Sequence, residues 1–374
     1  MGDHGLTGSR RAWAPGRVNL IGDHTDYNGG LVLPIAIDLG TEVLFRPTPG
    51  SPLLSAVSDE DRHPVRLDLD AIGIGRVPIG AIEPPWGRFV AAVAAAAGRT
   101  SGGALTVRST LPVGAGLSSS ASLCVGLTLA LGDPPLGRAA GPLRGPLRGP
   151  AGGPAGPVAL AHRAREAERE ATGVSTGIMD QLCVAAARAG HALLIDCATE
   201  SLQHVPVPGD CEVVVIHSGV SRSLATSPYG QRRAECDAAA RRVGSLATAG
   251  LGALDEIGDP LLRRRARHVI TENRRVAEFA QAMAVGDLAS AGRLMTESHR
   301  SLRDDFEVST PVLDGLVGEL IALPGIFGAR LTGAGFGGCV VALGTPHALD
   351  VQHWPKRAWR VQACGGATVS DAGP

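Results

Sequence analysis

The order of the apolar segments restricts the fold of this chain most strongly. Short segments rich in branched apolar residues predict strands, and longer patterns with apolar residues at helical spacing lie between them. The two kinds mix without the regular alternation of a doubly wound sheet, so we predict an α+β architecture. The predicted strands are LVLPIAI (31–37), TEVLF (41–45), ALTVRS (104–109), HALLID (191–196), CEVVVIHS (211–218), GARLT (328–332) and CVVAL (339–343). The predicted helices span residues 86–98, 120–131, 158–171, 229–243, 260–285 and 310–323.

Length, charge and cysteine content exclude several classes of protein. A chain of 374 residues can form two domains with their own cores. A formal net charge of −1 provides no overall field that attracts nucleic acid. The longest apolar run, residues 89–98, is about half the length of a membrane-spanning helix. The cysteine count is odd, at seven, and no CxxC pair occurs, which fits a reduced compartment better than a disulfide framework. We expect a cytoplasmic protein that binds neither nucleic acid nor membranes.

One segment differs in composition from the rest. Residues 133–157 are rich in glycine and proline and contain an imperfect GPLR repeat. Such a segment buries too little apolar surface to offset the entropy of ordering it. Glycine does not recur at every third position, which excludes a collagen helix. We predict a mobile surface loop without a chemical role.

The sharpest functional signal is LPVGAGLSSSASL, residues 111–123. Gly114 and Gly116 lack Cβ atoms, so backbone N–H groups near them can point at one place. Three serines follow, and then a predicted helix begins, whose N-terminal N–H groups and dipole favour phosphate oxygens. The loop fits neither the P-loop nor the dinucleotide-binding fingerprint. On this stretch alone, an anion cradle and an ordinary turn before a serine-capped helix are equally open.

Two weaker signals lie further along the chain. LTGAGFGGCVVAL (331–343) has four glycines in six residues between two predicted strands, which suits either close backbone approach to a ligand or a flexible hairpin. GVSTGIMDQL (173–182) places Asp180 at the start of a helix, where a carboxylate is usually a cap or a dipole partner.

A polar turn precedes the first predicted strand. PGRVNLIGDHTDYN (15–28) contains two acids, a histidine, an arginine and a tyrosine around one Gly-Asp turn, and it runs directly into the strand at 31–37. Many groups that need partners therefore lie beside a folding core.

In their order along the chain, these four stretches resemble the GHMP kinases and, among them, the galactokinase family. The resemblance runs from about Trp13 to Leu343 and includes the segments RHVITENRRV (267–276) and GRLMTESHRSLRDDFEVSTPVLDGLV (292–317). It implies an N-terminal domain (1–200) similar to domain 2 of ribosomal protein S5 and a ferredoxin-like C-terminal domain (201–374). Sugar and ATP would lie in the cleft between them. It also implies ATP-dependent phosphorylation of the anomeric hydroxyl of α-D-galactose, and we expect a monomer.

The resemblance assigns roles to individual residues. Asp180 and Arg17 would form the catalytic pair, since phosphoryl transfer needs positioning, charge stabilisation and an acceptor for the hydroxyl proton. The polar turn would supply the partners that several sugar hydroxyls need. Mg²⁺ prefers hard oxygen ligands and usually takes one or two from the protein. The remaining assignments are Asp23, His24, Asp26 and Tyr229 for the sugar; Gly114, Gly116, Leu117, Ser118, Ser119, Ser120 and Ala121 for ATP; Ser120 and Glu168 for Mg²⁺; and Gly333, Gly335 and Gly337 for packing under the phosphate loop.

Several alternatives stay open. The family usually has Glu at the position of Asp23, whose shorter side chain withdraws the carboxylate by ~1.5 Å. A kinase for another sugar, such as an N-acetylated hexosamine or a pentose, is therefore one alternative. A catalytically silent sugar sensor is another, although such a protein would lose the catalytic pair or the cradle, and this chain keeps Arg17, Asp180 and SSSAS. Tyr229 can also be a half-buried ring, and Glu168 a solvated helix charge.

Overall fold

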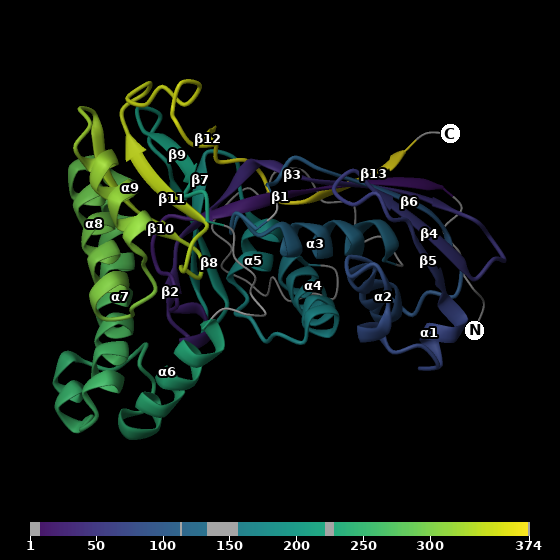
Figure 1. Cartoon of the computed structure of the whole chain (residues 1–374), viewed down its shortest axis with the longest axis horizontal. Coiled ribbons are helices and arrows are strands. Elements are labelled where there is room, and N and C mark those ends of the chain that lie inside the picture. Colours follow the sequence, from purple (N-terminus) through teal and green to yellow (C-terminus); the bar gives the residue numbers. More distant parts are fainter. Residues whose placement is uncertain (1–7, 113, 133–155, 221–227, 373–374) are drawn as a thin grey trace.

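The computed structural model describes residues 8–112, 114–132, 156–220 and 228–372 of the chain. Helices and strands mix along the chain, and the strands of the described residues form three sheets, which confirms the predicted α+β class. Figure 1 shows an elongated molecule with a large sheet over helices at one end and a group of helices at the other. The predicted glycine- and proline-rich loop lies outside the described residues over 133–155. No helix in the described ranges is both long enough and apolar enough to cross a bilayer.

The first half of the chain builds most of a six-stranded sheet that is covered on one face by helices. Its strands are β1 (Ser9–Asn19), β3 (Pro34–Pro47), β4 (Leu53–Ser58), β5 (Val65–Asp68), β6 (Gly103–Ser109) and β13 (Thr368–Ala372), in the order β13-β1-β3-β6-β4-β5. The helices are α1 (Leu69–Gly73), α2 (Gly87–Ala96), α3 (Ser119–Leu131), α4 (Pro157–Thr172) and α5 (Met179–Ala186). In Figure 1, α2, α3 and α4 lie under the sheet. Apolar side chains of both layers, such as Phe45, Val90 and Leu127, form one buried cluster.

The predicted strand at 31–37 is two strands. β2 (Leu31–Val32) joins one sheet, whereas β3 begins at Pro34 and joins another. Between them, the Leu33 N–H donates to Ile21 O and Leu33 O accepts from the Leu20 N–H, each at 3.1 Å. Leu33 therefore pairs with the polar turn instead of continuing either strand. The break places this turn at the junction of the two sheets.

The second half builds a four-stranded antiparallel sheet with helices packed on it. The strands are β9 (Glu212–His217), β10 (Ile326–Thr332), β11 (Cys339–Gly344) and β12 (Ala358–Val361), in the order β10-β11-β9-β12. The helices are α6 (Tyr229–Val243), α7 (Pro260–Val285), α8 (Leu288–Asp304) and α9 (Pro311–Ile321). α6 and α7 have the predicted bounds, and the Asp259 side chain caps α7 by accepting from the N–H groups of Leu261 and Leu262. α8 was not predicted from the sequence.

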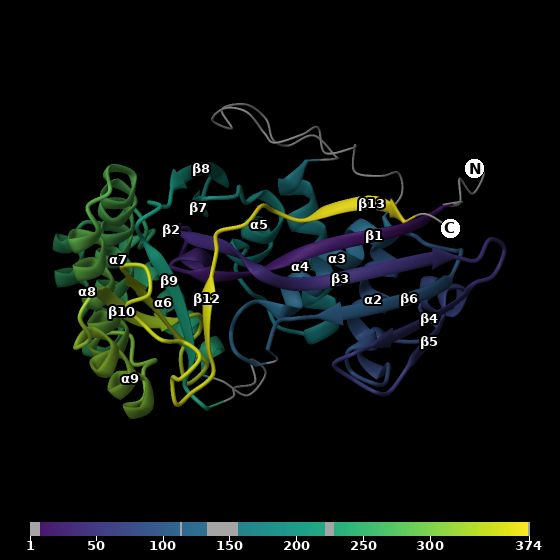
Figure 2. The ribbon, with the colours of Figure 1, turned by 90° about the horizontal axis from the view of Figure 1, so that it is seen from above.

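The third sheet and the last strand connect the two halves. β2 pairs with β7 (His191–Asp196), which pairs with β8 (Ser201–Pro206). β13, close to the end of the chain, pairs with β1, and Figure 2 shows the two side by side. The domain boundary predicted at residue 200 falls in the turn between β7 and β8 and stays a prediction.

Candidate active site

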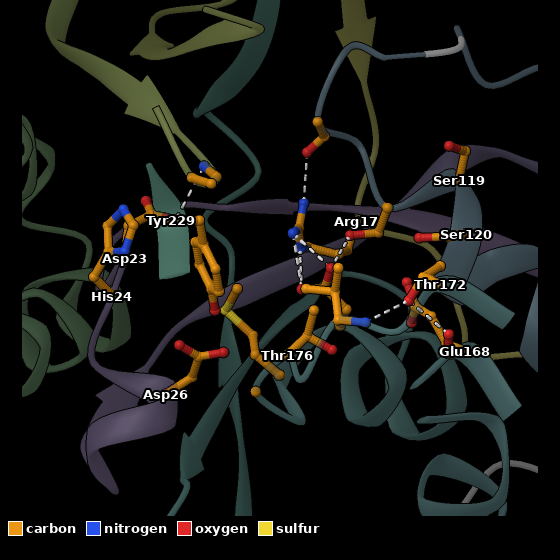
Figure 3. Close-up of a pocket in the computed structure, with 18 of the residues that line it drawn as sticks. Arg17, Asp23, His24, Asp26, Ser119, Ser120, Glu168, Thr172, Thr176 and Tyr229 are labelled. Atoms are coloured by element: carbon orange, nitrogen blue, oxygen red, sulfur yellow. Dashed lines mark hydrogen bonds and ion pairs between the residues drawn. The ribbon is translucent and has the colours of Figure 1, made fainter. Parts of the chain in front are cut away.

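A cavity of ≈ 450 Å³ gathers most of the residues that the sequence singled out. In Figure 3, His24, Asp26 and Tyr229 lie on one side of Arg17, and Ser119, Ser120 and Glu168 lie on the other. The predicted residues that line the cavity are Arg17, Asp23, His24, Asp26, Gly114, Gly116, Ser118, Ser119, Ser120, Glu168, Asp180, Tyr229 and Gly333. The other four predicted residues, Leu117, Ala121, Gly335 and Gly337, are not among its lining residues. Leu117 and Ala121 are buried in the apolar interior instead.

Arg17 and Asp180 form a fork-like ion pair inside this cavity. The Nε and Nη2 atoms of Arg17 donate to the two carboxylate oxygens of Asp180 at 2.8 Å each. The third nitrogen of the guanidinium, Nη1, donates to Gly116 O at 2.7 Å. The Arg17 side chain is 7% exposed and that of Asp180 is 27% exposed, so the carboxylate is the more accessible partner. The pair thus joins β1, α5 and the glycine loop before α3.

The loop before α3 has the backbone geometry of a cradle. Gly114 and Gly116 adopt φ values of 72° and 79°, and Ser118 reaches φ 61°, a left-handed conformation that is uncommon outside glycine. Ser118 occupies the N-cap position of α3, yet its side chain makes no capping hydrogen bond. Its hydroxyl donates to the Asp180 carboxylate at 2.5 Å. The alternative of an ordinary serine-capped helix is therefore wrong, and the first turn of α3 keeps N–H groups that can bind an anion.

Glu168 on α4 is a buried carboxylate at the same end of the cavity. It is only 5% exposed and accepts a hydrogen bond from the Gln181 amide. Burial raises its pKa to about 7; hydrogen bonds from Ser120 and Gln181 oppose this shift, and the charge of Asp180 adds to it. The interpretation of Glu168 as a solvated helix charge is therefore wrong. A desolvated carboxylate beside a serine hydroxyl is a donor set that suits Mg²⁺.

After β1 ends, the rest of the polar turn (residues 20–28) is fixed to the glycine stretch that follows β10. Asp23 is 2% exposed, and its Oδ1 accepts from the Gly333 N–H at 3.0 Å. Its Oδ2 pairs with Arg330, which is itself fully buried on β10. Both carboxylate oxygens of Asp23 thus have partners within the protein.

The next residues of the turn face the cavity. Asp26 begins a short 3-10 helix (Asp26–Asn28), and burial, followed by the charge of Asp180, raises its pKa to about 6. His24 adopts φ 67°, and a hydrogen bond of 3.0 Å joins its Nδ1 to the Tyr27 hydroxyl. Tyr229, at the start of α6, lies with its ring centroid 5.7 Å from His24 and 5.4 Å from Tyr27. Tyr229 is half-buried and also lines the cavity, so its two interpretations are compatible.

The family of the chain follows from comparison with known proteins. Residues 7–47 match the galactokinase galactose-binding signature. Residues 87–139 match the GHMP kinases N terminal domain, and residues 279–353 match the GHMP kinases C terminal model. The chain is 42% identical over 345 residues to the galactokinase of Roseiflexus sp. (strain RS-1), covering 88% of this chain and 82% of that one. It is 41% identical over 375 residues to the Homo sapiens galactokinase, covering 95% and 91%. The chain belongs to the galactokinase family.

Solved structures agree with this membership. The structure of Lactococcus lactis galactokinase complexed with galactose has a TM-score of 0.83 and 30% identity, and covers 96% of this chain and 95% of that one. A mevalonate kinase, with a TM-score of 0.65 and 19% identity, shares the fold. The predicted two-domain GHMP kinase fold is confirmed. As a galactokinase the chain phosphorylates galactose with ATP, and the silent-sensor alternative loses its support.

Two residues that support the candidate site, Gly177 and Arg330, were missed from the sequence. A Cβ on Gly177 would lie 1.7 Å from Asp26 Oδ2, so only glycine fits between the loop before α5 and the polar turn. Gly177 stands three residues before Asp180 in a stretch that was already singled out, which was a usable signal. Arg330 was treated as part of the predicted strand GARLT. An arginine within an otherwise apolar strand was the sign that it needs a buried partner.

Proposed function

We propose that the cavity transfers the γ-phosphoryl group of ATP to the anomeric hydroxyl of α-D-galactose, giving α-D-galactose 1-phosphate and ADP. The observation that carries this proposal is the Arg17–Asp180 fork. It is hydrogen-bonded to the glycine loop through Gly116 and Ser118, and it lines the same cavity as the polar turn. A sugar on one side and a triphosphate on the other would meet at this pair.

In this scheme, the Asp180 carboxylate accepts a hydrogen bond from the anomeric hydroxyl of the sugar. Arg17 and Ser118 donate three hydrogen bonds to its carboxylate. An ionised carboxylate can accept about four, so Asp180 keeps capacity for one hydroxyl of the substrate. That bond orients the oxygen for attack and gives its proton an acceptor, while Arg17 fixes the carboxylate plane and adds positive charge beside the reacting phosphate.

The polar turn recognises the sugar. His24, Asp26 and Tyr229 offer an imidazole, a carboxylate and a phenol to the cavity. Asp23 lines the cavity as well, but its two oxygens accept from Arg330 and Gly333, so we assign it the anchoring of the turn. The carboxylate of Asp23, which its shorter side chain withdraws from the sugar, thus binds groups of the protein instead.

The other end of the cavity binds the nucleotide phosphates. The loop from Gly114 to Ala121 supplies backbone N–H groups and the N-terminus of α3. Ser120 and Glu168 would hold Mg²⁺, which neutralises charge on the β- and γ-phosphates when it is bound. Burial raises the pKa of Glu168 to about 7, so its ionised form is less favoured than that of an exposed glutamate, and a bound cation would offset this cost. This cost supports a site built for a positive charge.

A sugar panel with product analysis tests the proposal. Purified protein receives ATP, Mg²⁺ and one of several sugars: galactose, glucose, N-acetylgalactosamine or arabinose. We expect the fastest ADP release with galactose and a product with phosphorus on the oxygen of C1 by NMR. Faster turnover of another sugar would contradict galactose as the preferred substrate. Phosphorylation at another hydroxyl would contradict the proposed position of the anomeric hydroxyl beside Asp180.

A further inference from the structure

The helix α7 contacts the polar turn through side chains that have no role in the chemistry above. They belong to the segment RHVITENRRV, residues 267–276. His268 and Glu272 are four positions apart and lie on one face of the helix. Asn273 directly follows Glu272 and is turned from it by about 100° around the helix axis. All three are buried.

Glu272 contacts the entry of the turn. Its Oε1 accepts from the Gly22 N–H at 3.0 Å and from the Ser298 hydroxyl, and its Oε2 accepts from Arg275 Nε at 2.7 Å. Burial opposes its ionisation, but the charges of Arg275 and Arg330 lower its pKa to about 2. Gly22 has φ 96°, and a Cβ there would meet Leu31 O at 2.7 Å. The carboxylate therefore binds the amide of Gly22, where the chain turns directly before Asp23 and His24.

His268 contacts the next peptide and, through a neighbouring ring, His24. A bond of 3.1 Å joins its Nε2 to Asp23 O, which can only accept, so Nε2 carries the proton. Its Nδ1 then accepts from the Ser301 hydroxyl at 2.9 Å. Burial lowers the pKa of His268 to about 4, which keeps the ring neutral. Phe306 packs on both His268 and His24, with centroid distances of 4.6 Å in each case.

Asn273 contacts the chain just after the polar turn, where β2 begins. Its Oδ1 accepts from the Leu31 N–H at 2.8 Å. A Cβ on the preceding residue, Gly30, would lie 2.4 Å from the same oxygen. α7 thus binds the backbone at residues 22 and 23 and again at residue 31. His24 and Asp26 lie between these points.

We propose that His268, Glu272 and Asn273 are positioning residues for sugar recognition, because they fix both ends of the turn that presents His24 and Asp26 to the sugar. The inference deepens the proposed function and depends on the sugar role given to this turn. It also assigns a purpose to the contact between α7, in the second half of the chain, and the turn from the first half. None of the three side chains lines the cavity among the described residues, so they act through the backbone and, for His268, also through the ring of Phe306.

Substitution of Asn273 tests the exit contact. Asn273→Leu removes the acceptor for the Leu31 N–H, whereas Asn273→Asp keeps an oxygen there. By calorimetry without ATP, we expect Asn273→Leu to weaken galactose binding about tenfold, the size of one lost hydrogen bond to a buried amide. Asn273→Asp should bind galactose like the wild type, and the KM for ATP should be unchanged in both. Equal galactose affinity in all three proteins would overturn the proposal.

A second pair of variants tests the entry contact. Glu272→Met/Arg275→Met removes both charges of a buried pair, which proteins tolerate better than the loss of one. It should again weaken galactose binding about tenfold, since the Gly22 N–H loses its acceptor. Arg275→Met alone breaks the same ion pair but keeps that acceptor. This control should lose thermal stability and keep its galactose affinity, and an equal loss of affinity in the control would show a merely structural role.

Wild-type turnover separates the two proposals. If the wild type phosphorylates galactose and the α7 variants bind it unchanged, only the positioning role fails. If the wild type neither binds nor phosphorylates galactose, the proposed function fails with it.

Discussion

Arg17 and Asp180 lie 163 positions apart in the chain and meet through two hydrogen bonds of 2.8 Å. A guanidinium fork on a carboxylate fixes both the distance and the plane of the two groups. Because Gly116 and Ser118 join the same pair, the orientation of Asp180 is tied to the loop that would bind phosphates. The proposed acceptor of the sugar hydroxyl is thus hydrogen-bonded directly to the proposed phosphate cradle.

The pH dependence of activity should respond to Mg²⁺. The pKa of Glu168 is raised to about 7, so a proton competes with a cation for this carboxylate near neutral pH. We expect kcat/KM for MgATP to rise with pH through about 7 at low free Mg²⁺, and this limb should move to lower pH as Mg²⁺ increases. Glu168→Gln should abolish the movement. A limb that stays in place at every Mg²⁺ concentration would remove Glu168 from the metal site.

The same carboxylate should lower the stability of the protein without ligands. The native pKa of Glu168 lies above its ordinary value of 4.5, so its stabilising contribution is fully present below pH 4.5 and is lost as pH rises through about 7. Glu168→Gln stays neutral and should be more stable than the wild type at pH 8, by at most about 3 kcal/mol. Urea denaturation without Mg²⁺ and nucleotide measures this difference. The gain should disappear at pH 4, and Glu166→Gln, on the exposed face of the same helix, should show none.

Asp23→Asn should destabilise the protein. The substitution leaves the fully buried Arg330 without its anionic partner. Breaking a buried pair from one side costs about 3–5 kcal/mol, which urea denaturation would detect. The double variant Asp23→Asn/Arg330→Met should recover part of this loss. Unchanged stability with a large rise in the KM for galactose would instead show that Asp23 contacts the sugar.

Gly177→Ala should impair galactose binding. The added Cβ would lie 1.7 Å from Asp26 Oδ2, so the loop or the carboxylate must move. We expect a large rise in the KM for galactose with little change in the KM for ATP. Gly318→Ala on α9 is the matched control, since a Cβ there meets no atom within 4 Å. It should stabilise the helix by up to about 1 kcal/mol and leave both KM values unchanged.

The sequence predicted helices better than strands, for physical reasons. α6 and α7 carry their own signals, such as the Asp259 cap and the proline at the first position of α7. β1 was missed because its residues, SRRAWAPGRVN, include charges, proline and glycine, and β3 and β13 on either side make it a strand. A period-two pattern was not available there.

The contents of the site were predicted from motifs, but its internal contacts were not. The resemblance named Arg17 and Asp180, and the structure brings them together. It named Asp23 as a sugar residue without its buried partner Arg330, which is 307 positions away. Nor did any pattern show that α7 binds the polar turn, because those contacts run from side chains to the backbone and depend on the packing of two halves of the chain.

The most direct test of the account is the turnover of Asp180→Asn. The amide keeps the size of the side chain but is a far weaker acceptor for the hydroxyl proton. We predict that kcat falls about 10²–10⁴-fold, while the dissociation constant for galactose changes little. An Asp180→Asn enzyme with a kcat near the wild-type value would show that this carboxylate does not accept the proton of the sugar hydroxyl.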